Sequence, residues 1–281
     1  MDRRMVVAGG GAALGLSLWR ARGFAAEAQA PDFALAGALS QGGWARGLVP
    51  PGSRVLSLAG NPVDVAKDGR FFIAFDRDSA ANLELSARLA DGRTLARAVT
   101  VAPRAWQIER IPIGPKPGTP PSEAYERLRS GELAQINAAR SIDHAVDGWR
   151  QKFIWPVYGR ISGKFGSQRI YNGVPGSYHS GLDIATGASG TPFVAPADGI
   201  VTLAAESPFS LEGKLLLIDH GMGLNSAFLH CSSHAVAVGD VVRQGQYIAN
   251  IGKTGRATGP HLHWSIKWRA SRLDPLLFLS A

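Results

Sequence analysis

The stretch Ile251-Gly-Lys-Thr-Gly-Arg-Ala-Thr-Gly-Pro-His-Leu-His263 ends in two imidazoles, placed two residues apart directly after a Gly-Pro pair. Proline is tolerated at the start of a β-strand but not in its middle, so Pro260 predicts a strand that begins near His261. Side chains at positions i and i+2 of a strand point to the same face. His261 and His263 should therefore project side by side, about 7 Å apart by Cα rise. One of them can bind a metal while the other reaches past it to a substrate.

Further candidate ligands lie upstream in this predicted β-region. The segment His179-Ser-Gly-Leu-Asp183 offers an imidazole and a carboxylate four residues apart, and His230 stands alone after an apolar strand. His, Asp and His are good ligands for Zn²⁺, and three protein ligands leave a fourth position for water, as in a catalytic site. Each pattern alone is common in proteins that bind no metal. Together, in a chain with one cysteine, they favour a zinc site.

The region from about Gly159 to Pro275 resembles the catalytic domain of the lysostaphin/LytM family of peptidoglycan metallopeptidases, peptidase family M23. Besides the two stretches already quoted, the matching segments are Pro192-Phe-Val-Ala-Pro-Ala-Asp-Gly-Ile-Val201, Ile218-Asp-His-Gly221 and Val238-Gly-Asp-Val-Val-Arg-Gln-Gly-Gln246. The front half more loosely resembles exported members of the family that carry an N-terminal β-sandwich. The resemblance covers about 115 residues in the family's order.

The resemblance implies a zinc ion bound by His179, Asp183 and His263, with His230 and His261 beside the open coordination position. It implies hydrolysis of peptide cross-links of peptidoglycan by a zinc-activated water, since zinc lowers the pKa of bound water towards about 7. His230 and His261 would orient the water, take up its proton and stabilise the oxyanion. Which of the two is the general base stays open, as does the peptide bond that is cut.

The sequence predicts a mainly β protein. Between residues 31 and 111, apolar residues alternate with polar ones and are interrupted by Asp68-Gly69 and Asp91-Gly92, and Asp-Gly between alternating runs is a strong hairpin signal. We expect a small antiparallel N-terminal β-sandwich at 31–111 and an antiparallel, β-rich catalytic domain at 151–281. The sandwich has no His or Cys and hence no metal chemistry of its own.

Residues 112–150 should join these two domains. Residues 112–121 form a proline-rich, fairly stiff linker, and residues 122–149 have the pattern of a helix. Leu128, Leu133, Ile136, Ile142 and Val146 give a rough apolar stripe that Gly131 interrupts. We therefore expect two helical segments, with His144 in the connector as a surface or interdomain residue.

The first residues have the features of a secretory signal peptide. A short positive n-region at Arg3-Arg4 is followed by an apolar stretch to Trp19 and by small residues that suit cleavage after Ala28. Residues 1–28 are therefore expected to be removed, without a membrane anchor afterwards, and the protein to act in the periplasm or cell envelope or outside the cell. Whether export uses the general or the twin-arginine route stays open.

The overall charge of +8 favours polyanionic partners such as an acidic cell wall. Lys and Arg are scattered and no nucleic-acid motif accompanies them, so nucleic acid is not the expected partner. The expected partners are peptidoglycan peptides. Composition does not define the oligomeric state.

Residues near the predicted site receive their own interpretations. His220 sits in an Asp-His-Gly turn and should be structural, and His234 has no motif partner. Cys231 stands where the resembled family usually has leucine, and a small buried hydrophobe is the expected role. The segment Arg169 to Tyr178 leads directly into His179 and should form a cleft wall that contacts the substrate.

Three functions remain open on the sequence alone. The preferred one is an active wall endopeptidase. A non-catalytic or autoinhibited regulator of wall hydrolases could keep the fold, since an inserted segment can block a filled site. A peptidase acting on proteins is the third. The N-terminal sandwich could serve either targeting or inhibition.

Overall fold

The computed structural model describes residues 33–112 and 122–279. The predicted signal peptide and most of the proline-rich linker lie outside these residues. The described residues belong to one compact unit, and the division into domains at 31–111, 112–150 and 151–281 stays a prediction. Within the described part of the chain, no helix is long and apolar enough to span a membrane.

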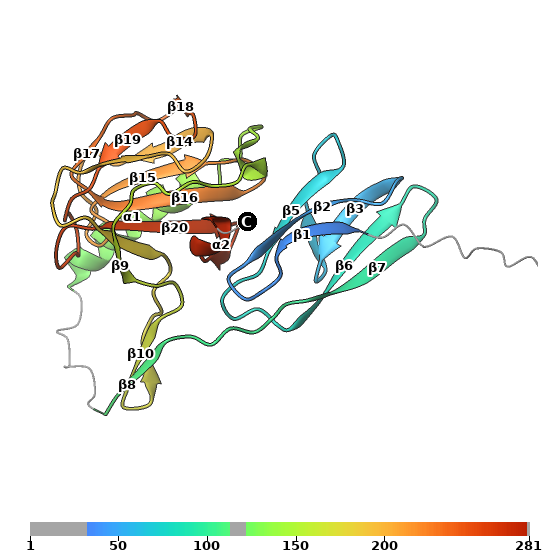
Figure 1. Cartoon of the computed structure of the whole chain (residues 1–281), viewed down its shortest axis with the longest axis horizontal. Coiled ribbons are helices and arrows are strands. Elements are labelled where there is room, and N and C mark those ends of the chain that lie inside the picture. Colours follow the sequence, from blue (N-terminus) through green and yellow to red (C-terminus); the bar gives the residue numbers. More distant parts are fainter. Residues whose placement is uncertain (1–32, 113–121, 280–281) are drawn as a thin grey trace, which may run out of the picture. The chain divides into compact units, whose positions relative to one another are not determined.

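Two antiparallel sheets fill the front part of the chain, with strand orders β1-β2-β5 and β4-β3-β6-β7 (Figure 1). The elements are β1 (Ala34–Ala38), β2 (Trp44–Leu48), β3 (Ser53–Leu58), β4 (Asn61–Val63), β5 (Arg70–Ala74), β6 (Asn82–Leu89), β7 (Thr94–Thr100) and β8 (Ile108–Ile111). The turn at Asp91-Gly92 joins β6 to β7 as predicted, and Gly92 has a φ of 87°, which glycine adopts without strain. The apolar alternation in β6 is confirmed, because Leu85, Ala87 and Leu89 are buried.

A large sheet dominates the rest of the fold, with strand order β18-β14-β15-β16-β20-β12-β9 and β21 paired to β20. Two three-stranded sheets accompany it, with strand orders β11-β10-β8 and β13-β19-β17. Its elements are β9 (Arg160–Gly163), β12 (Leu182–Ala185), β14 (Gly199–Ala204), β15 (Lys214–Asp219), β16 (Leu224–Cys231), β18 (Val241–Val242), β20 (Leu262–Trp268) and β21 (Ser271–Leu273). Smaller elements are β10 (Gln168–Tyr171), β11 (Val174–Pro175), β13 (Pro192–Val194), β17 (Ser233–His234), β19 (Tyr247–Asn250), the 3-10 helix η1 (Gly148–Arg150) and α2 (Leu276–Leu279). The mainly β fold class is confirmed.

The connector differs from its prediction. One helix, α1 (Glu123–Arg140), runs through Gly131 without a break, and no second α-helix follows it before β9. A Cβ at Gly131 would meet open space, so this glycine costs the helix only about 1 kcal/mol of propensity. Ser122 caps the N-terminus by accepting a hydrogen bond from the backbone N–H of Tyr125. Helix capping and side-chain anchoring therefore outweigh a single glycine.

The buried face of α1 matches the predicted stripe only at Ile136. Leu128 and Leu133 are exposed, whereas Ile136 and Ala139 pack on Leu215, Leu217 and other residues of the large sheet. Arg129 anchors the helix through two hydrogen bonds to the carboxylate of Glu212, at 2.6 and 2.7 Å. Bidentate pairs of this kind fix orientation as well as adding energy. The helix is thereby held on the sheet face that carries Ala227 and Leu229.

An aromatic cluster joins the front sheets to the C-terminal end of the chain. Phe278 lies 5.2 Å from Trp44 and 5.0 Å from Phe153, measured between ring centroids, and it also stacks on Phe72. The indole N–H of Trp44 donates to the carbonyl of Leu277 at 3.1 Å. The described residues on both sides of the linker thus share one hydrophobic core.

Replacing Phe278 by Ala should lower the free energy of unfolding by about 3–5 kcal/mol, because the side chain is 1% exposed and its removal leaves a cavity among three rings. Urea unfolding followed by tryptophan fluorescence measures the change. Leu128→Ala, at a side chain 56% exposed, is the matched control and should stay within about 0.5 kcal/mol. Equal effects of the two substitutions would contradict the shared core.

Candidate active site

Three side chains converge at the edge of β12 and β20. His179 Nε2 lies 3.0 Å from Asp183 Oδ1, and His263 Nδ1 lies 2.8 Å from the same oxygen and 3.1 Å from His179 Nε2. His179, Asp183 and His263 thus offer three ligand atoms within 4.8 Å of one another. The structure brings together the three residues for which the family resemblance implied zinc binding.

Strand pairing explains this convergence. In the antiparallel pair of β12 and β20, Asp183 stands directly opposite His263, so their side chains share one face of the sheet. His179 precedes β12, and its Nδ1–H donates to the carbonyl of Lys164 at 3.1 Å. That hydrogen bond fixes the orientation of the imidazole ring and leaves the lone pair of Nε2 available to a metal.

Two glycines keep space for these ligands. A Cβ at Gly163 would lie 2.3 Å from Asp183 Oδ2, and a Cβ at Gly181 would lie 2.6 Å from His263 Nε2. Both separations are far below an ordinary van der Waals contact, so any other residue would displace a ligand. Sequence reasoning did not single out either glycine, since an isolated Gly in a strand region has many causes.

The donor set fits a zinc ion. Two imidazole nitrogens and one carboxylate oxygen make up a common three-ligand set of catalytic zinc. With bonds of about 2.0–2.1 Å, a tetrahedral ion separates its ligand atoms by about 3.3 Å. The observed separations of 2.8–3.1 Å need to open by only a few tenths of an ångström. The residues present can therefore hold the metal that the sequence predicted.

Two further imidazoles lie beside the ligand set. The ring centroids of His230 and His261 are 4.9 Å apart, and those of His230 and His263 are 6.3 Å apart. His230 Nδ1–H donates to the carbonyl of Thr254 at 2.8 Å, and His261 Nδ1–H donates to the carbonyl of Gly259 at 2.9 Å. In each ring Nε2 is then the atom that can accept or return a proton, and that of His261 lies 3.8 Å from Asp183 Oδ1. All five predicted site residues lie in one cluster.

The backbone of His230 adopts a conformation that residues other than glycine rarely adopt. Its φ is 65°, in the left-handed region, and such a residue typically costs about 1–3 kcal/mol. The pairing of β15 with β16 is irregular between Lys214 and Leu216, opposite this end of β16. The N–H of His230 is held by the carbonyl of Glu212 at 2.8 Å. A strained backbone beside a cluster of residues that can bind a metal supports a functional role for His230.

Charge and burial shape the site differently at each residue. Burial would raise the pKa of Asp183, but hydrogen bonds from His179 and His263 outweigh it and hold that pKa well below its usual range. Burial would likewise lower the pKa of His179, but the hydrogen bond to Asp183 raises it. Burial lowers the pKa of His263, and it lowers the pKa of His230 to about 4. Asp183 is thus ionised and His230 neutral at neutral pH, as metal binding and proton acceptance require.

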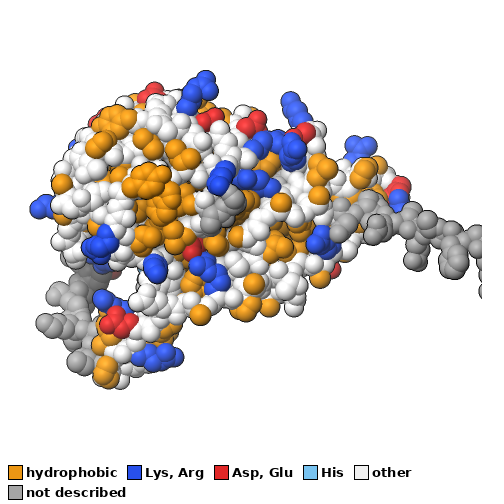
Figure 2. Space-filling model, viewed as in Figure 1, with side chains coloured by type: hydrophobic (Ala, Val, Ile, Leu, Met, Phe, Trp, Pro, Cys, Tyr) orange, Lys and Arg blue, Asp and Glu red, His pale blue; other side chains and the backbone are white. Residues whose placement is uncertain are grey.

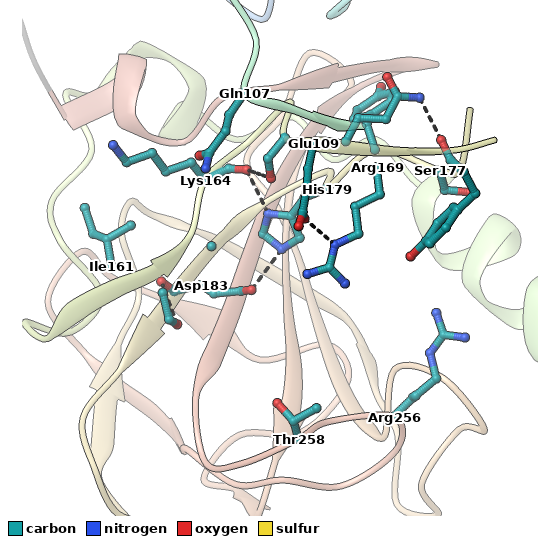
Figure 3. A pocket seen from close by; sticks show the side chains of 17 residues that line it. Gln107, Glu109, Ile161, Lys164, Arg169, Ser177, His179, Asp183, Arg256 and Thr258 are labelled. Carbon is teal, nitrogen blue, oxygen red and sulfur yellow. Dashed lines mark hydrogen bonds and ion pairs between the residues drawn. The ribbon is translucent and has the colours of Figure 1, made fainter. Parts of the chain in front are cut away.

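A cleft of about 980 Å³ opens onto His179 and Asp183 (Figure 3). Arg169, Tyr171, Gly176, Ser177 and Tyr178 line it, so the segment that leads into His179 forms a cleft wall as predicted. Figure 3 shows His179 between Lys164 and Asp183.

The cleft also contains residues from before the linker, which the sequence did not suggest. Strand β8 pairs in parallel with β10. The paired residues run from Ile108 with Gln168 to Ile111 with Tyr171. Gln107 and Glu109 therefore line the cleft, and Glu109 accepts a hydrogen bond from Arg169 at 2.8 Å. Pairing between strands about sixty residues apart leaves no local signal, so sequence reasoning could not find these two residues.

The remaining histidines lie apart from the ligand set. His220 is fully buried, with Nδ1–H donating to the carbonyl of Asp198 at 2.7 Å and Nε2 accepting from Ser226 at 2.8 Å, as a structural residue does. His144 is not in a helix; its Nδ1 and its backbone N–H both contact the carboxylate of Asp219. His234 lies in β17.

Cys231 is buried, and burial raises its pKa to about 12. Its thiol is therefore protonated at neutral pH and packs as a small hydrophobe.

Comparison with known proteins agrees with this geometry. The model of peptidase family M23 matches residues 177–275. The DD-carboxypeptidase/endopeptidase Mpg of Neisseria meningitidis is 35% identical over 120 residues, which cover 43% of this chain and 27% of that protein. The peptidoglycan DD-endopeptidase ShyB of Vibrio cholerae is 37% identical over 131 residues, covering 47% of this chain and 26% of that protein. The chain spans about a quarter of the length of these relatives.

A solved structure resembles more of the chain. The putative peptidase M23 of Pseudomonas aeruginosa superposes with a TM-score of 0.64 at 28% identity, covering 86% of this chain and 95% of that one. The likeness therefore extends beyond the catalytic region to the front sheets.

The fold and the His-Asp-His cluster define a metallopeptidase-type site. Residues 177–275 match peptidase family M23, so this region is a domain of the M23 (LytM) type.

Proposed function

We propose that this chain is an exported zinc metalloendopeptidase that hydrolyses peptide cross-links of bacterial peptidoglycan. The observation that carries the proposal is the cluster of His179, Asp183 and His263, flanked by two imidazoles and open to a large cleft. The printed names of the Neisseria and Vibrio relatives support peptidoglycan as the substrate.

The roles of the side chains follow from their positions. His179, Asp183 and His263 would hold the zinc ion, which when bound supplies a Lewis acid and a water of lowered pKa. His230 and His261 lie beside this set, each with Nδ1–H bound to a carbonyl and Nε2 left to exchange protons. One of them takes up a proton during attack and returns it to the leaving amine, and the other, in its protonated form, donates a hydrogen bond from Nε2 to the developing negative charge.

The cleft favours an active enzyme over an autoinhibited regulator. His179 and Asp183 line an open volume of about 980 Å³, so the described residues leave the ligand set accessible to an extended peptide. The walls are polar, with Gln107, Lys164 and Arg256 among the lining residues, which suits a peptide rather than an apolar ligand.

The location of this activity would be the cell envelope. Lys and Arg side chains are spread over the face seen in Figure 2, which suits general attraction to an anionic wall. Residues 1–28, proposed as the signal peptide, lie outside the described part of the chain.

Digestion of purified wall sacculi by the mature protein tests the proposal, together with the zinc content of the same preparation. We expect new peptide fragments and about one zinc per chain, because the ligand set forms a single three-ligand site. Mass spectrometry of the fragments identifies the bond that is cut, and His263→Ala is the control.

Two other outcomes would change the assignment. Bound zinc without release of any fragment would favour the regulatory function. Cleavage of casein but not of sacculi would favour a peptidase that acts on proteins.

A further inference from the structure

A second cavity lies beside the ligand set, between α1 and the strands β20 and β21. Its volume is about 240 Å³, and His263 and Ser180 are among the residues that line it. Besides Arg129, three cations line it: Arg140 from the last turn of α1, Lys267 from β20 and Arg272 from β21. The cavity therefore extends from a candidate metal ligand to a basic cluster.

The cations are placed together by the fold. Lys267 and Arg272 stand directly opposite each other in the antiparallel pair of β20 and β21, where like charges destabilise a sheet. Asn225 is the neighbour of Lys267 on the other side, and its side-chain oxygen accepts a hydrogen bond from Arg140. All three positive charges thus converge on one end of the cavity.

Among the described residues that line the cavity, one carboxylate faces these cations. Glu212 lines the same cavity, but it is engaged by Arg129 through two hydrogen bonds. The carboxylate of Asp76 accepts a hydrogen bond from the backbone N–H of Arg272 at 2.8 Å. Asp76 raises the pKa of Lys267, but its effect is the smallest among the groups that shift this pKa. Burial first, and then the positive charges of Arg140 and Arg272, lower the pKa of Lys267 to about 8. Four cations and one carboxylate therefore line the cavity.

A purely structural role explains only part of this cluster. Arg140 fastens the end of α1 through Asn225, but Lys267 and Arg272 gain nothing from that contact. Arg140 and Lys267 are half-buried, and Arg272 is exposed with its guanidinium carbon 5.5 Å from the ring centroid of Tyr178. Like charges gathered in this way persist where a ligand supplies the opposite charge, and such groups gather at functional sites.

The position of the cluster sets the geometry of a ligand. His263, Ser265 and Lys267 alternate along β20 and therefore share one face, with about 13 Å between the first and last Cα atoms. An extended peptide covers that distance in about three to four residues. In a bound peptide, a carboxylate held by the cluster would therefore lie about three to four residues from a peptide bond held at His263.

We propose that Arg140, Lys267 and Arg272 form a carboxylate-binding subsite, which selects peptide substrates that carry a free carboxylate about three to four residues' length from the cleaved bond. This inference rests on the proposed function, since it names the chemical class of the substrate for the same site. Guanidinium and ammonium groups in a confined cavity are the usual partners of a carboxylate.

The test compares two peptides that differ only in one carboxylate, which is free in the first and a carboxamide in the second. The zinc-loaded full chain should cleave the acid form with a kcat/KM about tenfold higher, mainly through a lower KM, as expected for one charge-assisted hydrogen bond. Lys267→Met and Arg272→Gln should each remove most of this preference while keeping the zinc content. Arg243→Gln, at an exposed arginine that lines neither cavity, should keep the full preference.

Equal cleavage of the two peptides by the unmodified chain would overturn the subsite and leave the proposed function standing. An unchanged preference in Lys267→Met would do the same. If neither peptide is cleaved, the proposed function fails, and calorimetric titration of both peptides into the zinc-loaded chain decides the subsite by itself. Competition by inorganic phosphate without discrimination between the peptides would indicate a general anion site and overturn the assignment to substrate.

Discussion

Asp183→Asn is expected to remove the bound metal and peptide hydrolysis together. Zinc should fall from about one per chain to near zero, because the substitution replaces the only charged ligand atom of the set with a neutral amide. The kcat/KM for peptide cleavage should fall by about 1,000-fold or more, since both the Lewis acid and the activated water are lost. Atomic absorption on the dialysed protein and a peptide-release assay measure the two effects.

Asp240→Asn is the matched control for this substitution. Asp240 is exposed, and its carboxylate accepts the backbone N–H of Ala237 at 2.8 Å, a hydrogen bond that an asparagine oxygen can replace. We expect unchanged zinc content and activity within about twofold, as for most surface changes. Full zinc content in Asp183→Asn would show that the metal is held elsewhere and would refute the assignment of the cluster.

The residues of the cluster could be predicted because their chemistry is local in the sequence. Pro260 and the i, i+2 spacing place His261 and His263 on one face of a strand, whatever surrounds them. Their meeting with Asp183 depends instead on the register of β12 against β20, and the spacing alone could not give it. There the resemblance to a family supplied what the spacing could not.

Other features of the site depend on contacts that are distant in sequence. Gln107 and Glu109 reach the cleft through the parallel pairing of β8 with β10, and neither residue stands out as a motif. Helix α1 continues through Gly131 because Arg129 binds Glu212, a contact that spans 83 positions. Tertiary anchoring of this kind overrides local propensity, which explains why the predicted break was wrong.

His230→Ala and His261→Ala should separate catalysis from metal binding. Each substitution should lower kcat by about 100- to 10,000-fold, the range expected for loss of a general acid–base group. Zinc content should stay near one per chain, because His179, Asp183 and His263 supply the ligand atoms within 4.8 Å of one another. His234→Ala is the matched control; its Nε2 has no hydrogen-bond partner among the described residues, so activity should change by less than about twofold.

The pH profile of the two variants can then decide which imidazole is the base. Burial lowers the pKa of His230 to about 4, so its ring is neutral and able to accept a proton at neutral pH. A base must be deprotonated to act, so activity that depends on it falls as the pH drops through its pKa. The variant that lacks the base should lose that acidic limb of kcat, whereas the variant that lacks the other histidine should keep it. Loss of zinc in His230→Ala would make His230 a ligand instead, and the strained backbone at that position would then serve metal binding rather than proton transfer.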